Sequence, residues 1–158
     1  MQAEGQPRRA ERIRRARRED IAALLPVVGG PPEGRLRALR RLTKTLAADL
    51  YVLDRAAEVR GVVAVVYRRS LAHGGLTATI DAVHAWGDAG AEQARRDTAA
   101  LVACAVARAR RRGCVAIDTS LPAAEVRSAL EAQGFTAGAS QLVLELRDQP
   151  AAAKRDPS

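Results

Sequence analysis

The pattern of apolar and polar positions predicts a long amphipathic helix and a short buried strand in the second half of the chain. Between Ala94 and Arg112, apolar side chains recur every three or four residues, as they do on one side of an α-helix. Arginines fill the last turn, and Gly113 stands where a C-terminal cap is expected. The next residues, Cys114–Ile117, form an apolar run of the buried-strand type.

The same criteria predict strands and helices elsewhere in the chain. In order they are a strand at 13–16, helices at 17–28 and 33–49, strands at 51–53, 61–67 and 76–85, the long helix, a strand at 114–118, a helix at 122–134 and a strand at 141–146. This order predicts an α/β fold with a mixed, mostly antiparallel sheet of six to seven strands and helices on both faces. We expect one domain over 12–147, between disordered polar tails at 1–11 and 148–158.

Composition excludes several classes of protein. Of the 158 residues, 47% are apolar, enough for a core, but no run approaches the roughly 18–20 apolar residues of a membrane span. The charged N-terminus has no apolar segment behind it, so it does not resemble a secretory signal. Cys104 and Cys114 match neither a disulfide framework nor a zinc pattern. We therefore expect a cytoplasmic protein with no membrane contact and no metal.

The net charge of +8 is a weak indicator of nucleic-acid binding. Arginine supplies nearly all of the 26 basic residues, as a GC-rich genome would favour, and only 3% of residues are aromatic for base stacking. We rank a nucleic-acid partner last. The cationic side of the second helix, with Arg37, Arg40, Arg41 and Lys44, is either a solvated surface or a contact for an acidic substrate or partner.

The start of the long helix is the candidate anion site. Free backbone N–H groups and the helix dipole favour phosphate at a helix N-terminus. We expect that N-terminus near Arg95, Arg96, Asp97 and Thr98.

Three segments together resemble the GNAT superfamily of acyl-CoA-dependent N-acetyltransferases. They are 13–20, where a short strand leads into an acidic helix start, 107–119, and Ala129–Phe135, which is similar to the family's Phe-Tyr-Glu-x-x-Gly-Phe signature. The resemblance spans roughly 11–146. It implies an enzyme that moves an acyl group, such as acetyl, from acetyl-CoA or another acyl-CoA to a primary amine of a small molecule or protein, by direct attack.

The resemblance places the pyrophosphate of CoA at 93–98, where the family usually reads Gln/Arg-x-x-Gly-x-Gly/Ala. Both glycines are absent there, so Arg96 and Thr98 would contact phosphate through their side chains, with Arg95 and Asp97 beside them. Alternatively, Gly87 and Gly90 lie just upstream, and the loop is displaced toward them.

The resemblance also implies catalytic and binding roles on the strand 76–85. Asp81 matches the family's general base, acting directly or through a water molecule. His84 has a suitable ordinary pKa, but regular alternation turns it to the opposite face from Asp81. The backbone from Val83 to Ala85 would bind the acyl carbonyl and the pantetheine arm, and Thr119 would touch CoA. The alternatives are a polar surface position for Asp81, a packed or surface His84, and a helix cap at Thr119.

Two departures from the family, the absent loop glycines and the residue at position 130, favour a second hypothesis. Leu130 stands at the position of the frequent general-acid tyrosine and cannot donate a proton. A catalytically degenerate GNAT-like binding or regulatory module is therefore the alternative to an enzyme. A homodimer paired through the last strand is also open.

Overall fold

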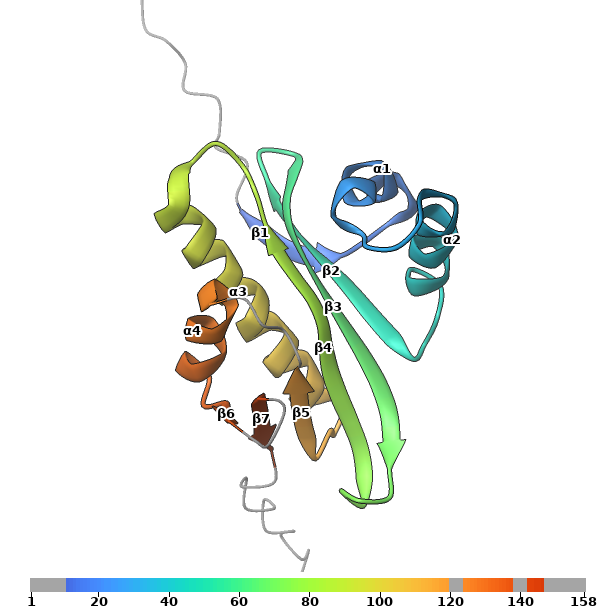
Figure 1. Ribbon diagram of the computed structural model, residues 1–158, viewed down its shortest axis with the longest axis vertical. Coiled ribbons are helices and arrows are strands. Elements are labelled where there is room, and N and C mark those ends of the chain that lie inside the picture. Colours follow the sequence, from blue (N-terminus) through green and yellow to red (C-terminus); the bar gives the residue numbers. More distant parts are fainter. Residues whose placement is uncertain (1–10, 120–123, 138–141, 147–158) are drawn as a thin grey trace, which may run out of the picture.

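A seven-stranded sheet forms the centre of the molecule (Figure 1). The computed structural model describes residues 11–119, 124–137 and 142–146, so the predicted tails lie almost wholly outside the described residues. The strand order is β1-β2-β3-β4-β5-β7-β6, and only β4 and β5 pair in parallel. The strands are β1 Arg12–Arg15, β2 Ala48–Arg55, β3 Glu58–Ser70, β4 Gly75–Ala85, β5 Ala116–Thr119, β6 Thr136–Ala137 and β7 Leu142–Glu145.

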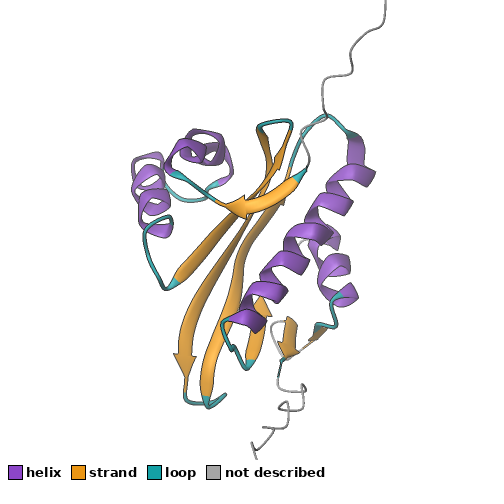
Figure 2. Ribbon diagram, turned by 180° about the vertical axis from the view of Figure 1, so that it is seen from behind, coloured by secondary structure: helices purple, strands orange, loops and turns teal. Residues whose placement is uncertain are grey.

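Helices cover both faces of this sheet, which confirms the predicted fold class (Figures 1 and 2). They are the α-helices α1 Ile21–Leu24, α2 Pro32–Leu42, α3 Gly90–Arg111 and α4 Ala124–Ala132, and the 3-10 helices η1 Arg18–Asp20 and η2 Leu25–Val27. The predicted stripe of α3 packs on one face, where Leu101, Val102 and Ala105 are fully buried. On the other face, Leu24 of α1 and Leu39 of α2 pack against β2 and β3.

The second helix is shorter than predicted. We expected it to run over 33–49, but α2 ends at Leu42 and β2 begins at Ala48. Leu46 continues the leucine spacing of the helix, yet its side chain is 81% exposed. Residues 48–55 instead form a strand because they are buried between β1 and β3.

A buried carboxylate fastens the C-terminal end of α3 to β2. Asp49 is fully buried and accepts hydrogen bonds from the Tyr67 hydroxyl at 2.9 Å, Arg108 Nε at 3.3 Å and Arg112 Nη2 at 3.1 Å. The Arg112 guanidinium also lies 4.1 Å from the centroid of the Tyr67 ring. Burial raises the pKa of Tyr67, so this hydroxyl stays a hydrogen-bond donor.

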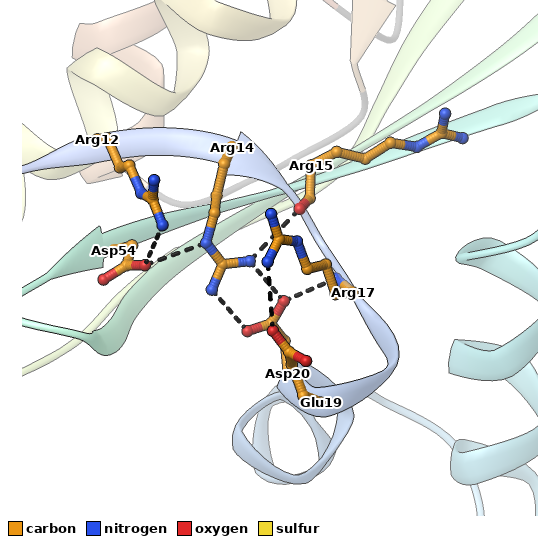
Figure 3. A network of polar contacts seen from close by, with 7 residues as sticks. All are labelled: Arg12, Arg14, Arg15, Arg17, Glu19, Asp20 and Asp54. Carbon is orange, nitrogen blue, oxygen red and sulfur yellow. Dashed lines mark hydrogen bonds and ion pairs between the residues drawn. The ribbon is translucent and has the colours of Figure 1, made fainter.

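A second ionic cluster fastens η1 and α1 to β1 and β2 (Figure 3). The Arg14 guanidinium makes a two-fold hydrogen bond to Asp20, at 2.7 and 2.8 Å, and donates to Asp54 at 3.0 Å. Asp20 also accepts the backbone N–H of Arg17 at 2.7 Å. Arg14 lowers the pKa of the Asp20 carboxyl, which therefore stays ionised in the folded protein.

Candidate active site

The parallel pairing between β4 and β5 ends about halfway along β4. Their pairing runs from Thr77 and Ala116 to Ile80 and Thr119, where β5 ends. Strand β4 continues to Ala85. Among the described residues, none pairs with 81–85 on the β5 side, and we call this side the open edge of β4. Val83 and Ala85, expected to bind through their backbone, both lie on this segment.

A β-bulge lies at the same point. Ala64 of β3 pairs with Ala82 and Val65 pairs with Ile80, so Asp81 has no partner and is the inserted residue. Because of this insertion, Ile80 and Val83 both pack in the core beneath α3. Regular alternation would have placed them on opposite faces.

The bulge corrects the expectation that Asp81 and His84 face opposite ways. Both side chains are exposed, and both line one cavity of about 280 Å³ between β4 and the α1–α2 side of the molecule. We name it the α1–α2 cavity. Its lining consists of Leu24, Val27, Val28, Gly29, Leu39, Leu42, Leu50, Val62, Ala64, Asp81, Ala82 and His84.

Apart from Asp81 and His84, the side chains of this cavity are aliphatic. They come from α1, η2, α2 and the middle strands. The cavity therefore offers one carboxylate and one imidazole at the wall of an otherwise apolar space. The leucines that α1 and α2 contribute to this lining lie at helical spacing in the sequence, but such spacing does not distinguish a cavity wall from ordinary core.

The loop between β4 and α3 provides the N-terminal amides of the long helix. Helix α3 begins at Gly90, and the loop before it contains Gly87. Both glycines have positive φ, +134° at Gly87 and +86° at Gly90, which other residues rarely adopt. A Cβ atom at Gly90 would meet no atom within 4 Å, so the backbone here is open to an approaching group.

The expectation that the helix begins near Arg95 is therefore wrong. Arg95 and Arg96 are well inside α3, exposed, with their Nε atoms 3.7 and 3.2 Å from carboxylate oxygens of Glu92. Asp97 is 2% exposed and receives two hydrogen bonds from Arg55, at 2.6 and 3.2 Å. These side chains have partners within the protein.

Thr98 and Thr119 are also placed by the protein's own packing. Thr98 is buried on the core-facing side of α3. Thr119 is buried, and its hydroxyl donates to the Ile80 carbonyl at 3.0 Å, across the point where β4 and β5 separate. This hydrogen bond marks the inner end of the open strand edge.

A hollow of about 250 Å³ lies beside the β4–α3 loop. Arg55 and Arg60 line it together with Trp86, Gly87 and Gly90. Arg60 forms an ion pair with Glu58 and would lie 3.2 Å from a Cβ atom at Gly87. The sequence does not indicate these two arginines, because they precede the loop by roughly thirty residues and reach it through the β2–β3 hairpin.

Neither position 130 nor the two cysteines supplies a reactive group. Leu130 is fully buried, so the position of the family's frequent tyrosine belongs to the core. Burial raises the pKa of both thiols, Cys104 and Cys114, and so disfavours the reactive thiolate.

The described residues hold neither a cluster of metal ligands nor a candidate membrane span. Among them, no three His, Cys, Asp or Glu side chains gather as metal ligands. No helix among them is both long and apolar enough to cross a membrane.

Neither a family model nor a curated protein matches the sequence, but many solved structures share its fold. A transcriptional regulator from Bacillus halodurans C-125 is 24% identical, with a TM-score of 0.66 over 81% of this chain and 94% of its own. A predicted acetyltransferase with acetyl-CoA from Clostridium acetobutylicum is 11% identical, with a TM-score of 0.66 over 82% and 92%. Ribosomal-protein-alanine N-acetyltransferase from Brucella melitensis biovar Abortus 2308 is 16% identical, with a TM-score of 0.61 over 93% and 100%.

These likenesses confirm the resemblance at the level of the fold. The chain has the fold of the GNAT acetyltransferases, with nearly the whole length of each compared structure covered. At identities below 25% the fold is what is shared, and the chemistry has to be argued from the residues of the site.

Proposed function

We propose that this chain transfers an acyl group from acyl-CoA to the nitrogen of a small apolar primary amine. One observation carries the proposal: the bulge at Asp81 lies where β4 parts from β5, and it turns a carboxylate into the α1–α2 cavity. The open edge of β4 and the apolar cavity therefore lie next to each other at Asp81.

The residues at the open edge fit an acyl-CoA. Free N–H groups at the start of α3 and the positive end of its dipole suit the pyrophosphate, and Gly90 leaves that backbone uncovered. The proposed phosphate site is therefore the β4–α3 loop. Arg95 and Arg96 lie too far along α3 for its free amides and are proposed only as charges that favour an anion from a distance. When bound, acyl-CoA would supply the activated thioester.

Asp81 is the proposed general base. An amine reacts only in its neutral form, so an ammonium substrate must first give up a proton, and the carboxylate accepts it directly or through a water molecule. His84 lines the same cavity and is the second group able to hold that proton. The lone pair freed on the nitrogen then attacks the thioester carbonyl.

The backbone at Val83–Ala85 is proposed to polarise that carbonyl. Unpaired N–H groups in fixed positions stabilise the negative charge that develops on the oxygen. The C–N bond forms as the C–S bond breaks. The nitrogen then loses its second proton to water, and the departing thiolate takes a proton from water, because Leu130 offers none.

The lining of the α1–α2 cavity supports an apolar acceptor. Burying aliphatic surface stabilises a complex by roughly 25 cal/mol per Å², whereas a second charge in this cavity would face leucine and valine side chains. A compact primary amine with an aliphatic or aromatic body matches both the volume and the lining.

Acetyl-CoA binding and turnover test the proposal in two steps. Ligand at about 100 times its dissociation constant should stabilise the fold by roughly 2.7 kcal/mol and raise the melting temperature. Thiol release should then be measured with a panel of aliphatic and aromatic primary amines. No thermal shift at millimolar acetyl-CoA would refute the proposal, and a shift without turnover on any amine would favour the degenerate binding module.

Two variants assign the base. Asp81→Asn should lower turnover by about 10²–10⁴-fold, the usual contribution of a general base, while the thermal shift with acetyl-CoA persists. His84→Gln tests the second candidate for the base in the same cavity and should lower turnover less than Asp81→Asn. If His84→Gln abolishes turnover and Asp81→Asn does not, the base is His84 and the assignment of Asp81 is wrong.

A further inference from the structure

The cations without an acidic partner are concentrated in one part of the molecule. Most described arginines, on the β-strands and α3, form ion pairs with Asp or Glu. On η1 and α2 and just after α2, no ion pair is found for Arg18, Arg37, Arg40, Arg41 or Lys44 within the described residues. Arg35, also on α2, has no ion pair either, but it donates to the Gly30 carbonyl. Elsewhere among the described residues, only Arg69, Arg110 and Arg111 lack an ion pair.

Three of these cations, Arg18, Arg40 and Lys44, line a hollow between η1 and the end of α2. It measures about 290 Å³ and has the buried residues Ala16 and Ile21 among its walls. We name it the η1–α2 hollow, lined by Ala16, Arg17, Arg18, Ile21, Arg40, Thr43 and Lys44. Arg40 and Lys44 also line a wider and shallower depression of about 680 Å³ along α2.

Acidic groups do little to offset this charge. Glu19 lies 3.5 Å from Arg17, but both side chains are well exposed, so this pair is weak. Glu33 lies at the rim of the wider depression and does not line the η1–α2 hollow. Four cationic side chains therefore share a concave space with no carboxylate in its lining.

We infer that the η1–α2 hollow is a binding site for a soluble, multiply charged phosphate anion, of the polyphosphate class. Guanidinium groups match phosphate oxygens with paired N–H donors, and an ammonium group adds a compact charge. A multiply charged anion satisfies several cations at once, whereas chloride or a carboxylate satisfies fewer.

The site is separate from the proposed acyl transfer. It lies among η1, α1 and α2, away from the β4–α3 loop. It nonetheless shares structural elements with the α1–α2 cavity, because Leu24 follows Ile21 on α1 and Leu39 precedes Arg40 on α2. A bound anion would bridge the two segments that form one side of that cavity.

Calorimetric titration with inorganic tripolyphosphate tests the inference on the full chain. The wild-type protein should bind it, with affinity falling as salt rises and the Debye length shrinks to about 8 Å near physiological ionic strength. The variant Arg40→Glu/Lys44→Glu should bind at least about tenfold more weakly, a difference of about 1.4 kcal/mol. Both side chains are exposed, so the fold should persist.

The matched control is Arg110→Glu/Arg111→Glu. It makes the same change in net charge at exposed positions near the end of α3. This control should bind tripolyphosphate as the wild type does. Equal binding by all three proteins would overturn the inference, as would no binding by the wild type.

Two further probes separate other sources of phosphate. Binding to single-stranded RNA, or to vesicles of phosphatidylglycerol, in place of tripolyphosphate would also overturn the inference. The response to acetyl-CoA should be the same in the Arg40→Glu/Lys44→Glu variant and the wild type. Failure of the anion site and failure of the proposed acyl transfer therefore give different results.

Discussion

Replacing Gly90 with alanine tests whether the β4–α3 loop is the phosphate site. A methyl group there meets no atom within 4 Å, so the substitution acts through the backbone conformation, at φ +86°. The left-handed conformation costs a non-glycine residue about 1–2 kcal/mol, and lower entropy of the unfolded chain returns about 0.4–1 kcal/mol. The expected net loss is about 1 kcal/mol, or about 2–4 °C in melting temperature for a domain of this size.

The effect on acetyl-CoA binding should be larger than the effect on stability. A hydrogen bond to a charged group contributes about 1.5–3 kcal/mol, so losing one lowers affinity by roughly 10- to 100-fold. Gly113→Ala is the matched control, because Gly113 also has positive φ, +74°, with open space around it, and lies at the opposite end of α3. Calorimetry should show weaker acetyl-CoA binding for Gly90→Ala only. Equal affinities for the two variants would refute the loop as the phosphate site.

Three further predictions concern stability. Asp97→Ala removes the buried partner of Arg55. Because that guanidinium is partly exposed, the free energy of unfolding in urea should fall by about 2–3 kcal/mol, less than the usual loss of about 3–5 kcal/mol for a buried pair. No change in the urea midpoint would contradict this. Ala57→Gly relieves a positive φ of 66° in the β2–β3 turn and should stabilise the fold by about 0.5–1 kcal/mol, seen as a higher urea midpoint at constant slope; a lower midpoint would show that the turn is not strained. Arg14 lowers the pKa of the Asp20 carboxyl. The ion pair therefore stabilises the fold above the ordinary carboxyl pKa of about 3.9, and this stabilisation is lost as pH falls below that value. Asp20→Asn should reduce the dependence of stability on pH in that acid range, and an unchanged pH profile would argue against the pair.

Periodicity predicted the order and type of the elements because most of them bury one continuous face. It was less reliable where an element begins or ends outside the core. The first turns of α3 are exposed, so the apolar period becomes visible only near Thr98, and the helix start was placed too late. Leu46 extended the leucine spacing of α2 beyond its true end, although this side chain lies in solvent.

The candidate site was only partly visible in the sequence. Asp81 and His84 were both identified, but their common orientation depends on a bulge, and 76–85 reads as an ordinary alternating strand. The Arg55–Asp97 pair joins residues 42 positions apart, and sequence spacing carries no trace of such a contact. Backbone features are equally hidden, since the loop glycines acquire meaning only when their φ values are known.

The bulge places Asp81 outside the packing that holds the fold together. This residue belongs to no β-ladder pair and contributes no side chain to either hydrophobic core. Its removal would restore unbroken pairing with β3 while leaving Ile80 and Val83 on the face they now occupy. A single codon can therefore change or erase the proposed base without a folding penalty from the core, so descendants of this chain are free to lose or replace the proposed activity while the protein itself persists.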